Sequence, residues 1–264
     1  MRIVCVVKFV PDVDKLNYDF DKNILIRDQA RLTLNPDDAS GTAVALRLKK
    51  EHPGTSLEVI TMAPISVLPN LEDLLRMGFD KGTLLSDREF AGSDTYATSR
   101  ILARYLSSCS FDYIITGTHA VDGDTSHVPA QLGEWLGISQ ISGVSRLDFE
   151  HFNEGCARVS VEQERSMETY EVDSPAILSL SRESGYKLPY LRKADMDRYV
   201  KDHIQVVDRQ ALGLPKEETG LSGSRTKVLG TCTKQFEKRN RVLVKADEAG
   251  VETVFSYLVD KGIL

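Results

Sequence analysis

The segment THAVDGDTSHVP, residues 118–129, brings histidine, aspartate and hydroxyl side chains together in one short turn. An apolar run, YIITG, precedes the turn, and a helical pattern follows it. Gly123 would allow a close approach of the backbone to a ligand. The amides of Thr125, Ser126 and His127 would be free donors at the start of the helix. These features suit a phosphate or a pyrophosphate.

Other interpretations of the turn stay open. Asp122 and Asp124 carry the wrong charge for a phosphate, so they would have to cap the helix or point toward a ribose hydroxyl. One of them could also do nothing more than cap the helix. A metal site that adds His119 and His127 is disfavoured, because the acidic turn is too short for a calcium loop. Catalysis by Ser126 with His127 is disfavoured because adjacent helical residues do not face each other.

Two further polar segments could serve the same ligand. In FAGSDTYATSR, the side chains of Asp94, Thr95 and Thr98 would lie in the first turn of a predicted helix. They could contact a cofactor, or Ser93 or Asp94 could simply cap that helix. In LTLNPDD, Asn35 could hydrogen-bond the edge of a base or cap a helix.

Strands and helices alternate around these turns through about residue 140. Apolar, β-branched runs predict strands at residues 3–10, 57–62, 82–86 and 113–117. Helical patterns follow them at residues 39–52, 66–78, 93–108 and 125–137. This order predicts an α/β fold with a doubly wound, mostly parallel sheet. In such sheets the ligand lies at the carboxyl ends of the strands where strand order reverses, which the first and fourth strands would flank.

The character of the chain changes after this alternating part. Several runs between residues 144 and 181 have the pattern of strands in hairpins or a sheet extension. From Val206 to Lys245 the chain is polar and contains several glycines, which predicts an extended arm with little core of its own. A closing helix would then present an apolar face with Val251, Val254, Phe255, Leu258 and Val259.

Bulk composition limits the classes of function. The chain has 264 residues, of which 41% are apolar, so it can form one large domain with an appendage. A net charge of −6 without a dense Lys/Arg stripe argues against nucleic acid. No apolar run is long enough to predict a membrane span, and no signal-peptide pattern is present. The four cysteines are far apart, which suggests reduced thiols in a cytoplasmic protein.

Taken together, four segments resemble the β subunit of electron transfer flavoproteins. They are VVKFVPD, LNPDDASGTAVALRLKKEH, MGFDKGTLLSDREFAGSDTYATSRILA and TGTHAVDGDTSHVPAQLGEWLG. The resemblance implies a heterodimer whose α subunit carries one FAD. It implies a nucleotide-binding domain at residues 1–200, and an arm and helix at residues 201–264 that pack on the α subunit. Further partners would be a flavin-dependent dehydrogenase of the acyl-CoA or 2-hydroxy acid type, and ferredoxin or flavodoxin.

The resemblance also bears on the cofactor. In the plain one-electron carriers of this family the β subunit holds a structural AMP. In the electron-bifurcating members it holds a second FAD, which takes a hydride from NADH. The glycine between the two aspartates of Asp122-Gly123-Asp124-Thr125, and the Gly-Ser-Asp-Thr at residues 92–95, resemble the FAD-holding members. We therefore expect FAD and NAD as cofactors, with AMP in place of FAD as the alternative.

Positions in the family's site carry over to this sequence. The adenine and ribose end would be lined by Val6, Asn35, Pro36, Asp37, Asp38 and Met62. The phosphates would be held by the turn that contains Asp122, Gly123, Asp124, Thr125, Ser126, His127, Val128, Pro129 and Gln131. The residues just before it, His119, Ala120 and Val121, would also bind the cofactor. Asp94, Thr95 and Thr98 would reach the flavin side. The sequence departs from the family at His119, where Gln is usual, and at residues 127–129.

No catalytic side chain is expected, because the flavin itself would do the chemistry. The family's recognition loop for dehydrogenases usually reads LNEPRYPxL, and residues 183–191 lie at its position here. Leu191 falls at the anchor, but the Asn-Glu-Pro-Arg run is absent. We expect Leu191 to contact a partner dehydrogenase. The alternative is that Leu191 packs on its own subunit.

Overall fold

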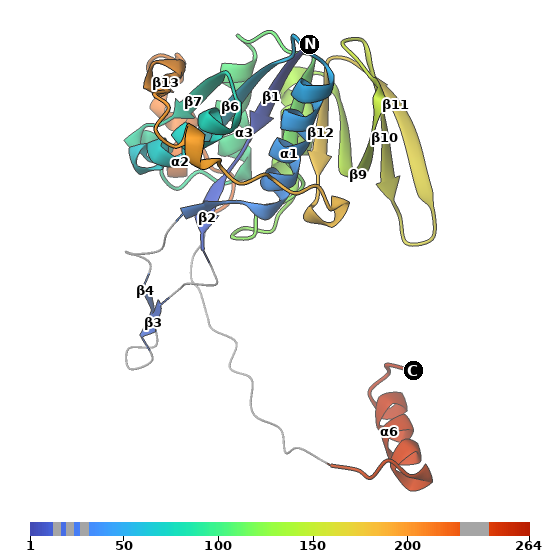
Figure 1. Cartoon of the computed structure of the whole chain (residues 1–264). Helices are drawn as coiled ribbons and strands as arrows, with labels where there is room; N and C mark the ends of the chain where they lie inside the picture. Colours follow the sequence, from blue (N-terminus) through green and yellow to red (C-terminus); the bar gives the residue numbers. More distant parts are fainter. Residues whose placement is uncertain (13–16, 20–23, 27–31, 228–242) are drawn as a thin grey trace. The chain divides into compact units, whose positions relative to one another are not determined.

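The computed structural model describes residues 1–12, 17–19, 24–26, 32–227 and 243–264. The chain forms two compact units, Met1–Lys227 and Val228–Leu264 (Figure 1). The first contains the central sheet, and the described part of the second contains helix α6 (Glu248–Asp260). Among the described residues, no helix combines the length and apolar character that a membrane span needs.

The central sheet has nine strands in the described residues. From one edge to the other they are β11 (Met167–Asp173), β10 (Cys156–Glu162), β9 (Ser139–Phe152), β12 (Ala176–Leu180), β8 (Tyr113–Gly117), β1 (Arg2–Val6), β6 (Ser56–Met62), β7 (Lys81–Leu85) and β13 (Ile204–Val207). All neighbours from β9 to β13 pair in parallel, and β9, β10 and β11 pair antiparallel. The chain runs outward from β1 through β6 to β7 and then returns to β8, on the other side of β1. This confirms the α/β doubly wound fold, with the switch in strand order between β1 and β8.

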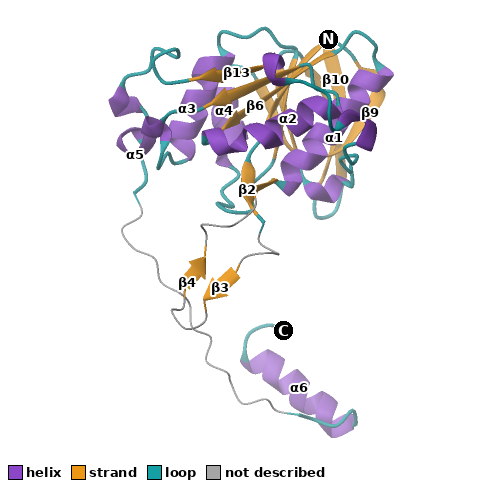
Figure 2. Cartoon of the chain, turned by 60° about the vertical axis from the view of Figure 1, so that its left-hand side comes forward, coloured by secondary structure: helices purple, strands orange, loops and turns teal. Residues whose placement is uncertain are grey.

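Helices cover both faces of this sheet (Figure 2). They are α1 (Pro36–Glu51), α2 (Leu68–Met77), α3 (Thr95–Leu106) and α4 (His127–Leu136). Residues of α1 and α2, among them Leu48 and Leu71, belong to one buried cluster, and Ile101 of α3 and Leu132 of α4 belong to another. Alternate residues of β1 enter the two clusters, as expected for a strand that is buried on both faces.

Short elements complete the first unit. Antiparallel pairs are formed by β2 (Phe9–Pro11) with β5 (Leu32–Leu34) and by β3 (Asn17–Asp19) with β4 (Ile24–Ile26). Single turns of helix are η2 (Ile65–Val67), η3 (Arg88–Phe90), η4 (Arg182–Ser184), η5 (Lys193–Asp195), η6 (Lys201–His203), η7 (Lys216–Glu218) and α5 (Gly220–Gly223).

The first predicted strand is divided in two. The sequence suggested one strand over residues 3–10, but β1 ends at Val6 and the chain pairs again as β2. Between them, the amide of Lys8 donates to Asp38 Oδ2 at 2.8 Å, and its carbonyl accepts from the amide of Asn35 at 2.9 Å. The start of α1 therefore takes the hydrogen bonds that would have continued the strand.

From Val206 onward the sequence predicted an extended arm with little core of its own, and the structure describes part of this segment. β13 adds to the edge of β7, and Leu212 and Leu214 are buried. The first unit consequently extends to Lys227. Because this segment is mostly polar, its sequence did not predict that a few apolar side chains are buried. It also did not predict that the backbone forms the edge strand of the sheet.

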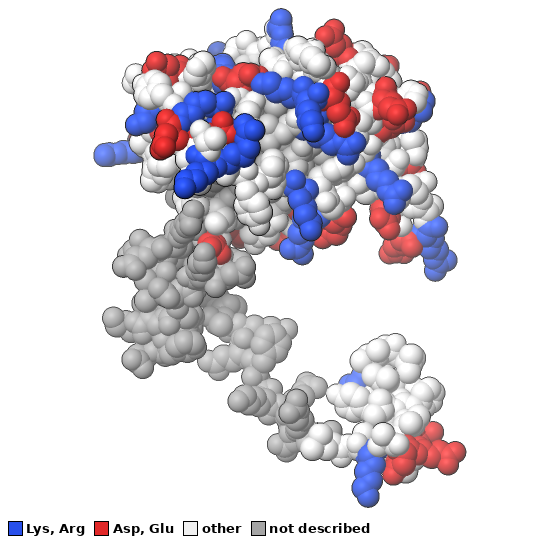
Figure 3. Space-filling model, in the orientation of Figure 1, with Lys and Arg blue, Asp and Glu red and all other residues white. Residues whose placement is uncertain are grey.

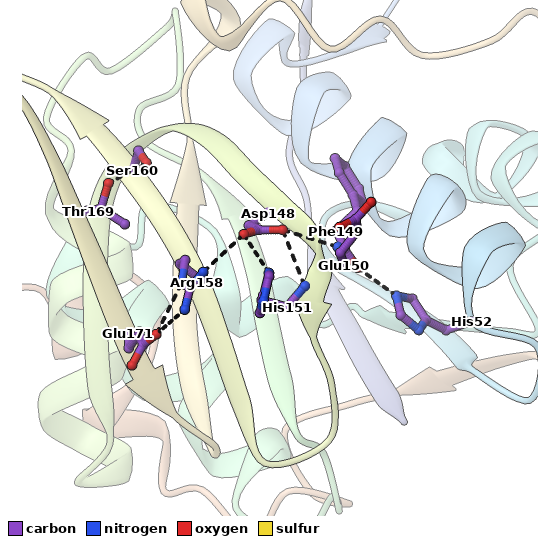
Figure 4. Close-up of polar contacts among 9 residues, drawn as sticks. All are labelled: His52, Asp148, Phe149, Glu150, His151, Arg158, Ser160, Thr169 and Glu171. Carbon is purple, nitrogen blue, oxygen red and sulfur yellow. Dashed lines mark hydrogen bonds and ion pairs between the residues drawn. The ribbon is translucent and has the colours of Figure 1, made fainter.

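The antiparallel strands β9, β10 and β11 carry several paired polar side chains. Arg158 of β10 pairs with Glu171 of β11 at 2.6 Å, and Asp148 of β9 pairs with His151 at 2.8 Å (Figure 4). His52, at the end of α1, contacts the carbonyl of Phe149 through Nε2 at 3.1 Å. Elsewhere on the surface, basic and acidic side chains are interspersed on the face shown in Figure 3.

Candidate nucleotide site

A cavity of about 480 Å³ lies at the carboxyl ends of β1, β6 and β8. The first turns of α1, α3 and α4 complete its wall, together with Thr226 from the end of the first unit. This is where an open α/β sheet binds its ligands, because the loops diverge at the switch in strand order. The volume is within the range of small-molecule and cofactor pockets.

The cavity brings most of the predicted site residues together. Those that line it are Val6, Asn35, Asp38, Met62, Asp94, Thr95, Thr98, His119, Ala120, Gly123, Thr125, Ser126, His127, Val128 and Pro129. Those outside the lining are Pro36, Asp37, Val121, Asp122, Asp124 and Gln131. Residues expected at the adenine end, the phosphate turn and the flavin side thus share one cavity.

Sequence reasoning missed several lining residues. They are Val7, Lys8, Ser93, Leu102, Thr116, Gly117, Thr118 and Thr226. Most of them adjoin predicted residues at strand ends or helix starts, so the same rule could have found them. Thr226 has no such signal, because it reaches the cavity from a distant, polar part of the chain.

Two aspartates at the start of α1 hold the loops around the cavity. Asp38 is buried, and its carboxylate accepts the amides of Lys8 at 2.8 Å and Gly117 at 2.7 Å. Burial raises the pKa of Asp38 to about 7, although the hydrogen bonds from these amides act to lower that pKa. A side chain on Gly117 would overlap the Asp38 carboxylate, so this close contact requires glycine.

Asp37 also connects loops around the cavity to the start of α1. It is buried, accepts the amide of Arg182 at 3.1 Å, and lies 2.8 Å from His119 Nδ1. Asp37 and Asp38 therefore connect the loops after β1, β8 and β12 to α1. The partial positive charge of the helix start favours carboxylates at this place.

Asn35 neither caps a helix nor presents a free amide. It occupies the position before α1, but its side chain makes no capping hydrogen bond. Nδ2 donates to the carbonyl of His119 at 2.8 Å, and Oδ1 accepts the amide of Val121 at 3.1 Å. Asn35 is fully buried, so it fixes the shape of the turn that follows β8.

The acidic side chains of the turn before α4 are not part of the cavity lining and are paired with two residues that are. Asp122 pairs with Lys8 Nζ at 2.8 Å, and Asp124 Oδ1 lies 3.6 Å from His119 Nε2. α4 begins after Ser126 without a side-chain cap, so the proposed helix cap by Asp122 or Asp124 is wrong. Asp124 and Ser126 both have positive φ, 46° and 54°. Such strained backbone is concentrated at functional sites.

Several polar atoms at the cavity have no protein partner. Thr116 Oγ1 and Thr118 Oγ1 are buried without one in the part of the chain that the structure describes. Within the same residues, the amides of Thr125, Ser126 and His127 have no protein acceptor. Buried polar groups are normally satisfied, and free amides at a helix start bind anions. The residues present therefore fit a phosphate-bearing nucleotide.

The predicted docking residue Leu191 is half-buried, whereas its neighbour Tyr190 is 96% exposed. Both lie in the charged segment between η4 and η5. The proposed contact of Leu191 with a dehydrogenase stays a prediction. The aromatic ring of Tyr190 is the more accessible of the two side chains.

Comparisons with known proteins show the family to which the chain belongs. The profile of the electron transfer flavoprotein domain matches residues 22–207. The electron transfer flavoprotein subunit beta of Thermoanaerobacterium thermosaccharolyticum is 31% identical over all of both chains. CarD, a subunit of the caffeyl-CoA reductase-Etf complex of Acetobacterium woodii, is 34% identical over 86% of each chain. The acryloyl-CoA reductase electron transfer subunit gamma of Anaerotignum propionicum is 29% identical over all of both chains.

Proposed function

Because the chain belongs to the electron transfer flavoprotein family as a β subunit, we propose that it binds FAD in the cavity beside α4. In this proposal it pairs with an α subunit, accepts a hydride from NADH and passes the electrons on singly. One electron would go to the α-subunit flavin and one to a low-potential carrier such as ferredoxin or flavodoxin. The bound flavin would supply the exchange between two-electron and one-electron transfer.

The extent of the cavity supports FAD. Its wall includes the free amides at the start of α4 and continues to Thr95 and Thr98 at the start of α3. AMP has only one phosphate and would need only the adenine and phosphate parts of this wall. A dinucleotide would also use the hydroxyls of α3. This shared wall is the observation on which the preference for FAD over AMP rests.

Each part of the wall would have its own task. The amides of Thr125, Ser126 and His127 would bind phosphate oxygens. The apolar side chains of Val6 and Met62 would pack against rings of the ligand and exclude water from them. Asp37, Asp38 and Asn35 would keep the surrounding loops in place, since their polar atoms already bond to those loops. None of these residues has to exchange a proton.

The proposed dehydrogenase partner is of the acyl-CoA type. One relative is named as a subunit of a caffeyl-CoA reductase-Etf complex, and another as an electron transfer subunit of acryloyl-CoA reductase. A heterodimer of this kind would work in the cytoplasm, where thiols such as the buried Cys5 stay reduced. Leu191, with Tyr190 beside it, would contribute to the docking surface for the dehydrogenase.

A cofactor count tests the proposal. The chain is co-produced with its α subunit, the purified heterodimer is denatured, and the released FAD and AMP are measured per heterodimer. We expect two FAD and no AMP. One FAD with one AMP would contradict the bifurcating function and favour the plain carrier. Release of no flavin would contradict the flavoprotein function altogether.

A further inference from the structure

Asp94 was expected to contact the ligand, but its carboxylate is engaged by the protein. Oδ1 accepts the amide of Ala97 at 2.9 Å and so caps α3. Oδ2 accepts the amides of Arg225 and Thr226, both at 2.8 Å, and the hydroxyl of Thr226 at 2.9 Å. Burial alone would raise the pKa of Asp94, but these hydrogen bonds lower it, so the carboxylate is a charged acceptor at neutral pH.

The segment that reaches Asp94 is closely packed against the start of α3. Ser224 Oγ accepts the amide of Asp94 at 2.8 Å, and Ser224 is buried. A side chain on Gly220 would overlap the carbonyl oxygen of Glu89, so α5 lies directly against η3. The guanidinium of Arg225 lies 4.9 Å from the centre of the Tyr96 ring. Residues 220–226 therefore have a defined position on this wall.

This segment has two neighbours of functional interest. Thr226 lines the cavity together with Thr95 and Thr98. Lys227, the next residue, is the last one of the first compact unit. The same few residues are thus part of the cavity wall and the point from which the chain leaves for the second unit.

We infer that Asp94 is a positioning residue that holds Thr226 in the cavity wall and thereby couples nucleotide binding to the order of residues 224–227. A nucleotide in contact with Thr226 stabilises this segment, and the ordered segment in turn strengthens nucleotide binding, because coupling between two sites is reciprocal. This inference rests on the proposed nucleotide-binding function. It gives Asp94 an indirect role in place of the direct contact expected from the sequence.

Amide hydrogen exchange tests the coupling. The full chain, co-produced with its α subunit and freed of nucleotide, is compared with and without added FAD, and with and without added AMP. Exchange is followed at the amides of Arg225 and Thr226, and the dissociation constant of each nucleotide is measured separately. In the wild-type chain we expect FAD to slow exchange at both amides.

Three variants isolate the role of Asp94. In Asp94→Asn an amide group replaces Oδ2 opposite two N–H donors, so exchange of those amides should rise and FAD should no longer slow it. The dissociation constant for FAD should rise about tenfold, as expected for the loss of a charge-assisted hydrogen bond. Thr226→Val removes only the hydroxyl and should have a smaller effect. Asp87→Asn is the matched control, because Asp87 caps η3 and accepts the amide of Arg209, but does not line the cavity.

The outcomes distinguish a failure of the coupling through Asp94 from a failure of the proposed FAD-binding function. Wild-type exchange at Arg225 and Thr226 in Asp94→Asn, or unchanged FAD affinity, would overturn the inference. The same would follow if Asp87→Asn weakened FAD binding as much as Asp94→Asn does, since general destabilisation would then explain both. Loss of coupling while FAD still binds leaves the proposed function intact. A wild-type chain that does not bind FAD contradicts the proposed function, and the coupling with it.

Discussion

The first turns of α1 and α4 carry similar residues and have opposite roles. α1 follows β5 and α4 follows β8, and each helix has two aspartates at or near its start. Asp37 and Asp38 at α1 are buried and accept backbone amides from three loops. Asp122 and Asp124 before α4 are exposed and are directed to Lys8 and His119.

The difference between these two pairs of aspartates shows that burial, more than residue type, determines which groups a carboxylate near a helix start contacts. At α1 the buried carboxylates accept amides from the surrounding loops. At α4 the carboxylates are paired with Lys8 and His119, and the amides at the helix start have no protein acceptor among the described residues. The two turns are joined by Asn35, which precedes α1 and hydrogen-bonds the turn before α4.

The largest expected effect on stability comes from Gly117, which contacts the α1 region, in comparison with Gly123 in the turn before α4. Gly117→Ala would place a methyl group against Asp38, 2.8 Å from its backbone nitrogen. We expect it to lower the free energy of unfolding by about 3 kcal/mol, because a packed core tolerates such overlap poorly. The matched control is Gly123→Ala, where a side chain would meet nothing within 4 Å. Urea denaturation would contradict this comparison if the two variants were equally stable.

Replacement of Asn35, which links the two regions, should have the next largest effect on stability. Asn35→Ala removes two partly buried hydrogen bonds to the turn and leaves their partners at His119 and Val121 without this side chain. We expect a loss of about 2 kcal/mol in the free energy of unfolding, together with weaker FAD binding, measured by titration calorimetry. Unchanged FAD affinity in a destabilised Asn35→Ala chain would show that the shape of the turn does not govern the site.

A substitution confined to the α4 region should affect binding and spare stability. Gly123→Asp adds a negative charge on the cavity wall, and we expect FAD to bind at least about tenfold more weakly, a change of about 1.4 kcal/mol. The midpoint of urea denaturation should stay near that of Gly123→Ala. Retention of FAD by Gly123→Asp would show that the phosphates do not lie at this turn.

The smallest expected effect is a pH dependence from the α1 region. The folded-state pKa of Asp38 is raised to about 7, above the ordinary aspartate value of 3.8, so the folded chain holds a proton that the unfolded chain releases. Stability from this group is therefore lost as pH rises toward 7, by about 1 kcal/mol between pH 6 and 7.5. Asp38→Asn should be less stable at every pH and should lack this slope. An identical slope in urea denaturation of both proteins would assign it to another group.

Much of the architecture followed from local patterns. The alternation of apolar strands and helical segments predicted the parallel sheet, and the switch between β1 and β8 predicted the place of the cavity. The cap of α3 by Asp94 was one of the two alternatives that the sequence offered, and it is present. The division of the first strand was missed, because the residues that interrupt it, Asn35 and Asp38, are distant in the sequence.

The sequence by itself determined the fold and the loops that surround the cavity, because these depend on residue periodicity and on glycine, proline and hydroxyl residues at strand ends. It indicated the family through the resemblance of four segments to those of its β subunits. Only the tertiary structure decided what each carboxylate does. Asp38 holds backbone amides, Asp122 pairs with Lys8, and Asp94 holds Thr226. A carboxylate's role depends on its burial and on the donors around it, and chain segments far apart in the sequence supply those donors.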